Sequence, residues 1–381
     1  MARFAVALTL VLGLTACSEE PGPTGRTKPP EPTSVASGDT PAEGGKDAES
    51  PPPARLDVYG LSGPRSRANL AVYLLHDPHA PAGDLGCLSL EEAQKSGAVR
   101  VTEKAEGAEV NELQVENTGD QPVYLQAGDT VKGGQQDRTI GVDFVLPAKS
   151  GKRTVDAFCV EPGRWTVRTA AGQQAGAMVG AAFSLAEAPT PVATREQKLA
   201  VRLSKSQEQV WAAGRQVNGD LKAKVSTSSA GLGFARVLEE PKNSFVEAVE
   251  DPAVAKKLDE TVAALSNLLD GQPDAVGAAF CINGKVQSVE IYQAAGLFRK
   301  LWPKLLRAAA VEALASSPQG EAAGPPAQAE LRALLAGLEG RKGRMELRPE
   351  GPVVRIFEQE HVVLFDTESG GRLLHRQVLS R

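Results

Sequence analysis

The N-terminal half of the folded region carries the hydrophobic pattern of β-strands. Residues 70–75 form a short apolar run, and a strand resumes at residues 123–125 after the turn signal at residues 117–120. In residues 140–145, Ile, Val and Phe alternate with Gly, Asp and Val, as expected of a half-buried strand. Residues 154–160 form the next apolar run. We therefore expect this half to be a mostly antiparallel β layer.

Helical periodicity dominates the middle of the chain. Asp251 is an expected N-cap, because Pro252 follows it at the first helical position. Valine and leucine residues then repeat every three or four positions up to Gly271, which is the spacing of an amphipathic helix. A second apolar face runs over residues 298–314. We expect Pro303 in the first turn of that helix, because a proline further inside would break its hydrogen-bond ladder.

Two local signals mark a helix start and a hairpin. Ser89 and Glu92 have the spacing of a capping box, so a brief helix should begin there. Asn283-Gly284 lies between the apolar runs 275–282 and 286–292, and Asn-Gly in this setting is the strongest short-range hairpin signal. Strand patterns return in the tail, at residues 353–357, 362–365 and 373–379.

These patterns together predict an α+β fold. Its N-terminal half is mostly antiparallel β, its middle is helical, and its C-terminal strands return to the sheet region. Residues 54–381 are long enough to form one α+β globular domain with a sizeable core. A division into two lobes, about 54–190 and 191–381, is left open.

Residues 1–16 have the pattern of a secretory signal peptide. The apolar run from Phe4 to Leu14 is shorter than the roughly 20 residues that a membrane span requires. Leu14-Thr15-Ala16-Cys17 resembles the lipobox of bacterial lipoproteins, in which the cysteine receives lipid and becomes the new N-terminus. An ordinary cleaved signal beside a chance cysteine is the alternative. We expect lipid attachment at Cys17 and an extracytoplasmic place on a bacterial membrane, inner or outer.

Residues 17–53 are expected to be the lipidated cysteine and a disordered tether. Residues 18–53 contain nine prolines and five glycines and almost no large apolar side chains. Such a segment cannot bury enough surface to offset the entropy lost on ordering. As a flexible coil it would span about 35 Å.

The net charge limits the classes of macromolecule that the chain is expected to bind. The formal net charge is −5, which argues against a nucleic-acid partner and against anionic lipid as an electrostatic partner.

Apart from Cys17, the chain has Cys87, Cys159 and Cys281, so at most one disulfide can form. We favour buried thiols and leave a disulfide open. No spacing of Cys and His residues indicates a metal site, and no motif indicates a cofactor.

One polar stretch is the candidate site. Gly133-Gly134 allows a sharp turn, and Gln135, Asp137 and Arg138 follow it at the entrance to a strand. The neighbouring strand ends at a second polar group, so a hairpin would bring the two sets together. Arginine side chains could hold a phosphate or carboxylate as bidentate donors, and a tryptophan could stack on a ring. The second group consists of Glu161, Arg164 and Trp165.

A structural polar corner is the alternative to a ligand site. In that case Asp137 would pair with Arg164, or Glu161 with Arg138, and the ion pairs would join two loops without binding anything. The stretch also lacks a nucleophile with an adjacent base.

A resemblance to a known family rests on an ordered set of short segments. These are residues 133–138, 159–165, 209–211, 283–285 and 298–305. Together they resemble the ADP-ribosylglycohydrolase- and rhodanese/phosphatase-associated domain, and the likeness runs from about Leu56 to the C-terminus. The resemblance implies no established activity and no catalytic residue. The signal peptide departs from the intracellular setting that the family name suggests.

Two functional hypotheses follow. The first is a lipid-anchored binding or scaffolding protein whose ligand, a small molecule or a protein, is not identified. The second is an enzyme acting on a phosphorylated or ADP-ribose-like small molecule, with Asp137 or Glu161 as general base and the arginines holding charge on a phosphate. Whether Asp137, Arg138 and their neighbours open onto a pocket or pair with each other distinguishes the two from a structural corner.

Overall fold

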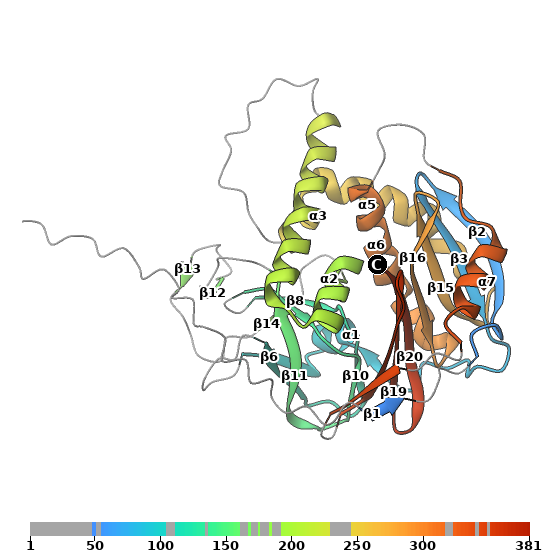
Figure 1. The fold of residues 1–381 in the computed structure, drawn as a ribbon. Coiled ribbons are helices and arrows are strands. Elements are labelled where there is room, and N and C mark those ends of the chain that lie inside the picture. The colour runs from blue at the N-terminus through green and yellow to red at the C-terminus, as the bar shows by residue number, and fades with distance from the viewer. Residues whose placement is uncertain are drawn as a thin grey trace, which may run out of the picture. The chain divides into compact units, whose positions relative to one another are not determined.

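The computed structural model describes most of the chain after the expected tether. The described residues are 48–50, 55–103, 111–133, 136–160, 167–168, 174–175, 183–184, 192–228, 245–316, 323–339, 343–348 and 351–381. All of them belong to one compact unit, Gly44–Arg381. This unit is α+β, with strands at both ends of its sequence and helices between them, as the hydrophobic pattern predicts (Figure 1).

A nine-stranded antiparallel sheet is the largest element among the described residues. Its order is β1-β17-β18-β19-β20-β16-β15-β3-β2, so strands from both ends of the chain lie in one sheet. The prediction that the C-terminal strands return to the sheet region is thus confirmed. The strands are β1 (Ala48–Ser50), β2 (Gly60–Arg67), β3 (Leu70–His76), β15 (Ala275–Ile282), β16 (Lys285–Tyr292), β17 (Gly343–Leu347), β18 (Val353–Glu358), β19 (Val362–Ser369) and β20 (Arg372–Ser380).

The edge strand β1 differs from the expectation for residues 17–53. Ala48–Ser50 pairs antiparallel with Gly343–Met345 of β17 instead of belonging to a disordered tether. The composition of residues 18–53 gives no strand pattern, because this pairing uses backbone groups, which every residue except proline supplies in full. The folded unit therefore begins before residue 54.

Both faces of the large sheet are covered, which explains the unbroken apolar run at residues 70–75. Leu70, Val72 and Leu74 pack with helix α6 (Ala295–Ala315) on one face. Ala71, Tyr73 and Leu75 pack with helix α7 (Gln328–Ala336) on the other. The two helices lie on opposite sides of β15 and β16 (Figure 1).

The N-terminal layer comprises strands β4 to β11. It contains a three-stranded sheet of order β10-β7-β4 and part of a six-stranded sheet of order β14-β8-β9-β11-β6-β5. Its alternate residues form a separate apolar core. The strands are β4 (Leu88–Ser89), β5 (Val99–Thr102), β6 (Glu112–Asn117), β7 (Val123–Leu125), β8 (Thr130–Gly133), β9 (Arg138–Ile140), β10 (Phe144–Leu146), β11 (Gly151–Cys159), and then β12 (Val167–Arg168), β13 (Gln174–Ala175) and β14 (Phe183–Ser184).

The strand expected over residues 140–145 is wrong as a single element. Strand β9 ends at Ile140, and β10 begins at Phe144 in a different sheet. Between them, Asp143 is completely buried and accepts hydrogen bonds from side chains that come from distant parts of the chain. The chain leaves the strand ladder here because a buried carboxylate must find donors.

The remaining helices surround these sheets. The capping box is confirmed, since Ser89 and Glu92 cap helix α1 (Leu90–Lys95). Asp251 caps the helix that follows it, as expected. The other helices are α2 (Arg195–Leu199), the π-helical turn η1 (Ala200–Ser204), α3 (Gln207–Ser228), α4 (Phe245–Glu250), α5 (Pro252–Leu265) and the short η2 (Ser266–Leu269).

Pro303 lies inside α6, not in its first turn. The helix begins at Ala295, so the expectation was wrong by about one and a half turns. Proline interrupts one backbone hydrogen bond in this position. Leu301, Trp302 and Leu305 around it are buried in the core, and their packing holds both halves of the helix against β15.

The hairpin at Asn283-Gly284 is confirmed. Strands β15 and β16 pair antiparallel across it, and both turn residues have positive φ, 52° and 77°. This is the geometry of a type I′ turn, for which Asn-Gly is favoured. The hairpin places Glu290 and Tyr292 at the far end of β16, next to β20.

Candidate functional site

Only two of the six sequence-predicted site residues lie within the described chain. The Asp137 carboxylate accepts a hydrogen bond of 3.0 Å from the amide of Gly133. The Arg138 guanidinium contacts the sulfur of Cys159 and lies 3.7 Å from Glu103 Oε1. Both side chains are buried and engaged within the fold. Gln135, Glu161, Arg164 and Trp165 lie outside the described residues.

Gln136, next to these residues, is one of three glutamines whose buried side-chain amide has no hydrogen-bond partner among the described residues; the others are Gln94 and Gln126. The Gln136 side chain is fully buried, and neither Nε2 nor Oε1 has a hydrogen-bond partner in the described part of the chain. Leaving a buried amide without hydrogen-bond partners costs about 1–3 kcal/mol, and an unobserved water or a ligand is one way in which such a group can be satisfied. Gln136 is not one of the candidate residues predicted from the sequence, although it lies between Gln135 and Asp137.

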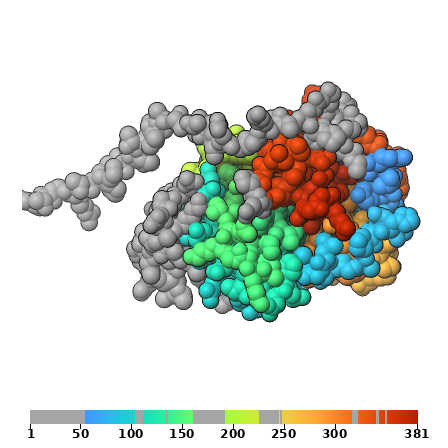
Figure 2. All heavy atoms as spheres, turned by 90° about the horizontal axis from the view of Figure 1, so that it is seen from below, coloured from blue at the N-terminus to red at the C-terminus, as the bar shows by residue number. Residues whose placement is uncertain are grey.

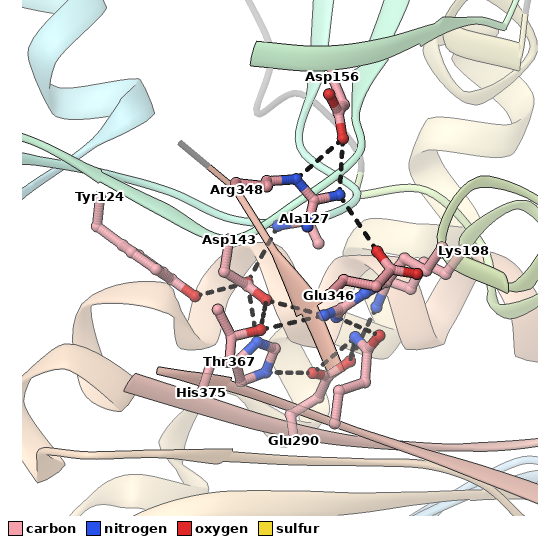
Figure 3. Close-up of polar contacts among 12 residues, drawn as sticks. Tyr124, Ala127, Asp143, Asp156, Lys198, Glu290, Glu346, Arg348, Thr367 and His375 are labelled. Carbon is pink, nitrogen blue, oxygen red and sulfur yellow. Dashed lines mark hydrogen bonds and ion pairs between the residues drawn. The ribbon is translucent and has the colours of Figure 1, made fainter. Parts of the chain in front are cut away.

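A second, larger cluster of polar side chains lies between the N-terminal layer and the nine-stranded sheet (Figure 3). At its centre, the imidazole of His375 on β20 contacts two carboxylates. Its Nδ1 is 2.9 Å from Asp143 Oδ1, and its Nε2 is 2.7 Å from Glu290 Oε2 on β16. All three residues are at most 1 % exposed. A histidine held between two carboxylates is expected to carry a proton on both nitrogens.

Cations from the α2–η1 segment complete the cluster. Lys198 Nζ lies 2.8 Å from Glu290 Oε1. Arg202 Nη2 lies 3.3 Å from Asp143 Oδ2, and its guanidinium also stands over the ring of Phe365, 4.4 Å from the centroid. These contacts pair each buried carboxylate with more than one positive group. The π-helical turn at Ala200–Ser204 brings Arg202 to this place, and π-helical turns are frequent at functional sites.

Neutral side chains occupy the remaining hydrogen-bonding positions. The hydroxyls of Tyr124 and Thr367 each donate to Asp143, at 2.9 Å. The Gln377 amide donates to both oxygens of Glu290, at 2.9 and 3.0 Å. The backbone amide of Ala127 donates to Asp143 Oδ1 at 3.1 Å. Asp143 is therefore the point at which the N-terminal layer, η1, β19 and β20 meet.

The pKa values of the cluster follow from the balance between burial and these charges. Burial alone would raise the pKa of Asp143, but the charges of His375 and Arg202 outweigh it and hold that pKa well below its usual range. In the same way Lys198 and His375 overcome burial and lower the pKa of Glu290 to about 2. For His375, burial lowers the pKa, but the two carboxylates outweigh it and raise the pKa above 6.5.

A further buried ion pair near the cluster joins helix α6 to the turn after β7. Lys304 Nζ of α6 is 2.5 Å from Asp129 Oδ1, and both side chains are at most 10 % exposed. The turn that carries Asp129 contains Gly128, with φ of +97°. A Cβ at this glycine would come within 3.1 Å of the Lys198 side chain. Glycine therefore lets the turn lie against α2.

A small cleft opens beside the cluster. It has a volume of about 20 Å³, room for one water molecule, and Arg202, Phe365, Asp156 and Arg348 are among its lining residues. Arg348 Nη2 lies 2.7 Å from Asp156 on β11. This pair joins the N-terminal layer to the C-terminal strands, which meet on the face shown in Figure 2. The cleft is too small for an organic ligand.

The cysteines, possible metal ligands and helix lengths of the described residues bear on the remaining chemical expectations. Cys87, Cys159 and Cys281 are buried free thiols. No group of three or more His, Cys, Asp or Glu side chains in the described ranges could hold a metal ion. Of the helices that the structure describes, none combines the length and apolar character needed to cross a bilayer.

Comparison with known proteins gives one match. Residues 59–379 match the model of the family described as ARG and Rhodanese-Phosphatase-superfamily-associated Protein domain. The match covers nearly all of the described fold and agrees with the resemblance seen in the ordered sequence segments. No curated protein and no solved structure shows significant similarity to the chain.

Proposed function

This chain belongs to the ARG and Rhodanese-Phosphatase-superfamily-associated Protein domain family, and we propose that it is a lipid-anchored binding or scaffolding protein outside the bacterial cytoplasm. Its ligand would bind at the corner formed by residues 136–138 and the end of β11. The unpartnered amide of Gln136 is the observation that carries the binding proposal.

The N-terminal sequence supports the anchor. An apolar run of signal-peptide length ends at Leu14-Thr15-Ala16-Cys17, and the family match begins only at residue 59. The intervening residues supply length without a hydrophobic core. Acyl chains on Cys17 would insert in the bilayer at about 0.8 kcal/mol per buried methylene, so two or more chains hold the protein firmly.

The corner at Gln136 supports a ligand with polar groups. The amide offers one acceptor and two donor hydrogens that the described fold does not use. Arg138 beside it, and Arg164, which follows β11 by five positions in the sequence, favour an anionic group such as a phosphate or a carboxylate. Asp137 and Arg138 already have partners in the fold. This favours recognition by a preformed corner over proton transfer by these two residues.

The anchor is tested by mass spectrometry of the protein purified from bacterial membranes. We expect an N-terminal Cys17 carrying a diacylglyceryl group, and the Cys17→Ser variant should lose the lipid and leave the membrane fraction. The matched control is Ser18→Ala, which should keep both. An unacylated wild-type N-terminus would contradict the anchor and leave the binding proposal standing.

Binding is tested with inorganic phosphate, ADP-ribose and nucleotides as probes, by thermal shift on residues 17–381 carrying Cys17→Ser. Gln136→Leu should match or exceed the wild-type melting temperature without ligand, because it removes an unsatisfied buried amide, yet it should lose any ligand-induced shift. Arg164→Ala should lose the shift and keep the fold. A Gln136→Leu variant that melts well below wild type would favour a structural corner. Turnover of a probe would favour the enzyme alternative.

A further inference from the structure

The Asp143–His375–Glu290 cluster joins parts of the fold that share no strand ladder. Asp143 belongs to the N-terminal layer, whereas Glu290 and His375 lie on adjacent strands of the nine-stranded sheet. Both neighbours of the imidazole are hydrogen-bond acceptors when ionised. Only the doubly protonated ring can donate to both, at the observed 2.9 and 2.7 Å.

We propose that this cluster is a proton-controlled latch between the N-terminal layer and the nine-stranded sheet. With a proton on both ring nitrogens, His375 holds Asp143 and Glu290 together. When one proton leaves, a nitrogen lone pair faces a carboxylate at hydrogen-bond distance, and the layer loosens from the sheet. The proposal does not depend on the lipid anchor, because every residue of the cluster lies in the described fold.

The groups around His375 explain why a proton is retained there. The negative charges come from Asp143 and Glu290, and both are held ionised by further cations. The ring of Tyr292 stacks on the imidazole with centroids 4.4 Å apart and excludes water from one face. The charged and titratable groups that face the cluster from the surrounding elements are Tyr124 (β7), Asp129 (the turn after β7), Lys198 (α2), Arg202 (η1), Tyr292 (β16) and Lys304 (α6).

One further group titrates in the same pH range and has to be separated from His375. Burial, followed by the nearby charge of Glu196, raises the pKa of Glu312 on α6 to about 7. Glu312 also senses the charge of Lys198, which contacts Glu290. Its ionisation therefore adds to the pH dependence without involving the imidazole.

Hydrogen exchange of the Ala127 amide reports on the latch, because this amide donates to Asp143 Oδ1. The experiment uses residues 17–381 carrying Cys17→Ser and measures protection from pH 6 to 9.5, corrected for the intrinsic exchange rate. Between the ordinary histidine pKa of 6.5 and the raised folded pKa of His375, we expect the protection of residues 124–129 to fall by up to about tenfold per pH unit, the limit for release of one proton, and to level off above the folded pKa. Amides in the centre of β15 should keep their protection.

Three variants assign the effect. His375→Gln should have lower protection at pH 6 and no further fall apart from the contribution of Glu312 near pH 7, because nothing at position 375 titrates. His361→Gln, whose imidazole is 85 % exposed, and Glu312→Gln should both keep the fall. Protection that stays constant in the wild type, or that falls equally in His375→Gln, would overturn the proposal. If His375→Gln does not fold, the NMR titration of His375 in the wild type decides. A titration midpoint at or below 6.5, or a fall in protection that does not level off near that midpoint, would overturn it.

Discussion

Asp143 Oδ1 and His375 Nδ1 are 2.9 Å apart, although the two residues are separated by 232 positions in the chain. The contact joins an interruption between two short strands of the N-terminal layer to the last strand of the large sheet. Both residues are completely buried, so their interaction is protected from screening by salt. This long-range pair organises the most extensive polar contacts among the described residues.

Replacing Asp143 should destabilise the fold strongly. Asp143→Ala leaves Arg202 without its buried counter-charge and His375 with only one of its two carboxylates, and breaking such a pair typically costs about 3–5 kcal/mol. Urea unfolding at pH 7 measures the loss. The control is Asp156→Ala, whose carboxylate is 44 % exposed, and it should lose less than about 1 kcal/mol. Equal losses in the two variants would contradict the central role of Asp143.

The contribution of Glu290 should disappear in acid. Its pKa is lowered to about 2 from an ordinary 4.5, so its ionised form stabilises the folded state. This contribution is complete above pH 4.5 and is lost as the pH falls towards 2. Accordingly, the difference in unfolding free energy between the wild type and Glu290→Gln should be constant from pH 5 to 6 and shrink below pH 4.5. A difference that grows in acid would show that the sign is wrong.

Two glycine-to-alanine substitutions should have opposite effects. A Cβ at Gly296, at the start of α6, would lie 2.4 Å from the backbone carbon of Gly83, so Gly296→Ala should destabilise by about 1–3 kcal/mol. At Gly219, exposed in α3, nothing lies within 4 Å, and Gly219→Ala should stabilise by about 0.5–1 kcal/mol. Thermal unfolding of both variants checks the pair. The same sign for both would contradict this packing of α6.

The three buried thiols should be unreactive in the folded protein. Burial raises the pKa of Cys159 to about 11 and of Cys281 to about 12, and Cys87 is also shifted upwards by burial. At pH 8 almost no thiolate is present, and solvent does not reach the sulfurs. In the Cys17→Ser chain, Ellman's reagent should find no thiol before denaturation and three after it. Rapid reaction of one thiol in the native protein would place it at the surface.

The sequence could predict those elements whose signals are local. Ser89 with Glu92 and Asn283 with Gly284 act within a few residues, and the structure contains the helix start and the hairpin that they predict. The predicted position of Pro303 in the first turn is wrong because the tertiary packing of α6 outweighs the local cost of a proline inside the helix. Asp143 looked like the polar member of an alternating strand, since nothing within ten residues reveals its contact with His375.

The two polar clusters also differ in how much of each could be predicted from local sequence. The glycine pair and the polar residues after it indicate a candidate site in the sequence. In the structure, Gln136 of this stretch has a buried amide without partners among the described residues. His375 stands alone in a strand pattern of the sequence, and in the structure both of its ring nitrogens have carboxylate partners. Its role in joining two layers could not be read from the sequence, because Glu290 and Asp143 approach it only in the folded chain.

The three residue pairs between β1 and β17 have a mechanical consequence. Ala48 pairs with Met345, Glu49 with Arg344 and Ser50 with Gly343, so the first contact among the described residues is a very short ladder. A pulling force that reaches the domain from a lipid at Cys17 would load this ladder before any buried strand. These three pairs would separate first, which would lengthen the tether by a few residues and leave the core strands in place.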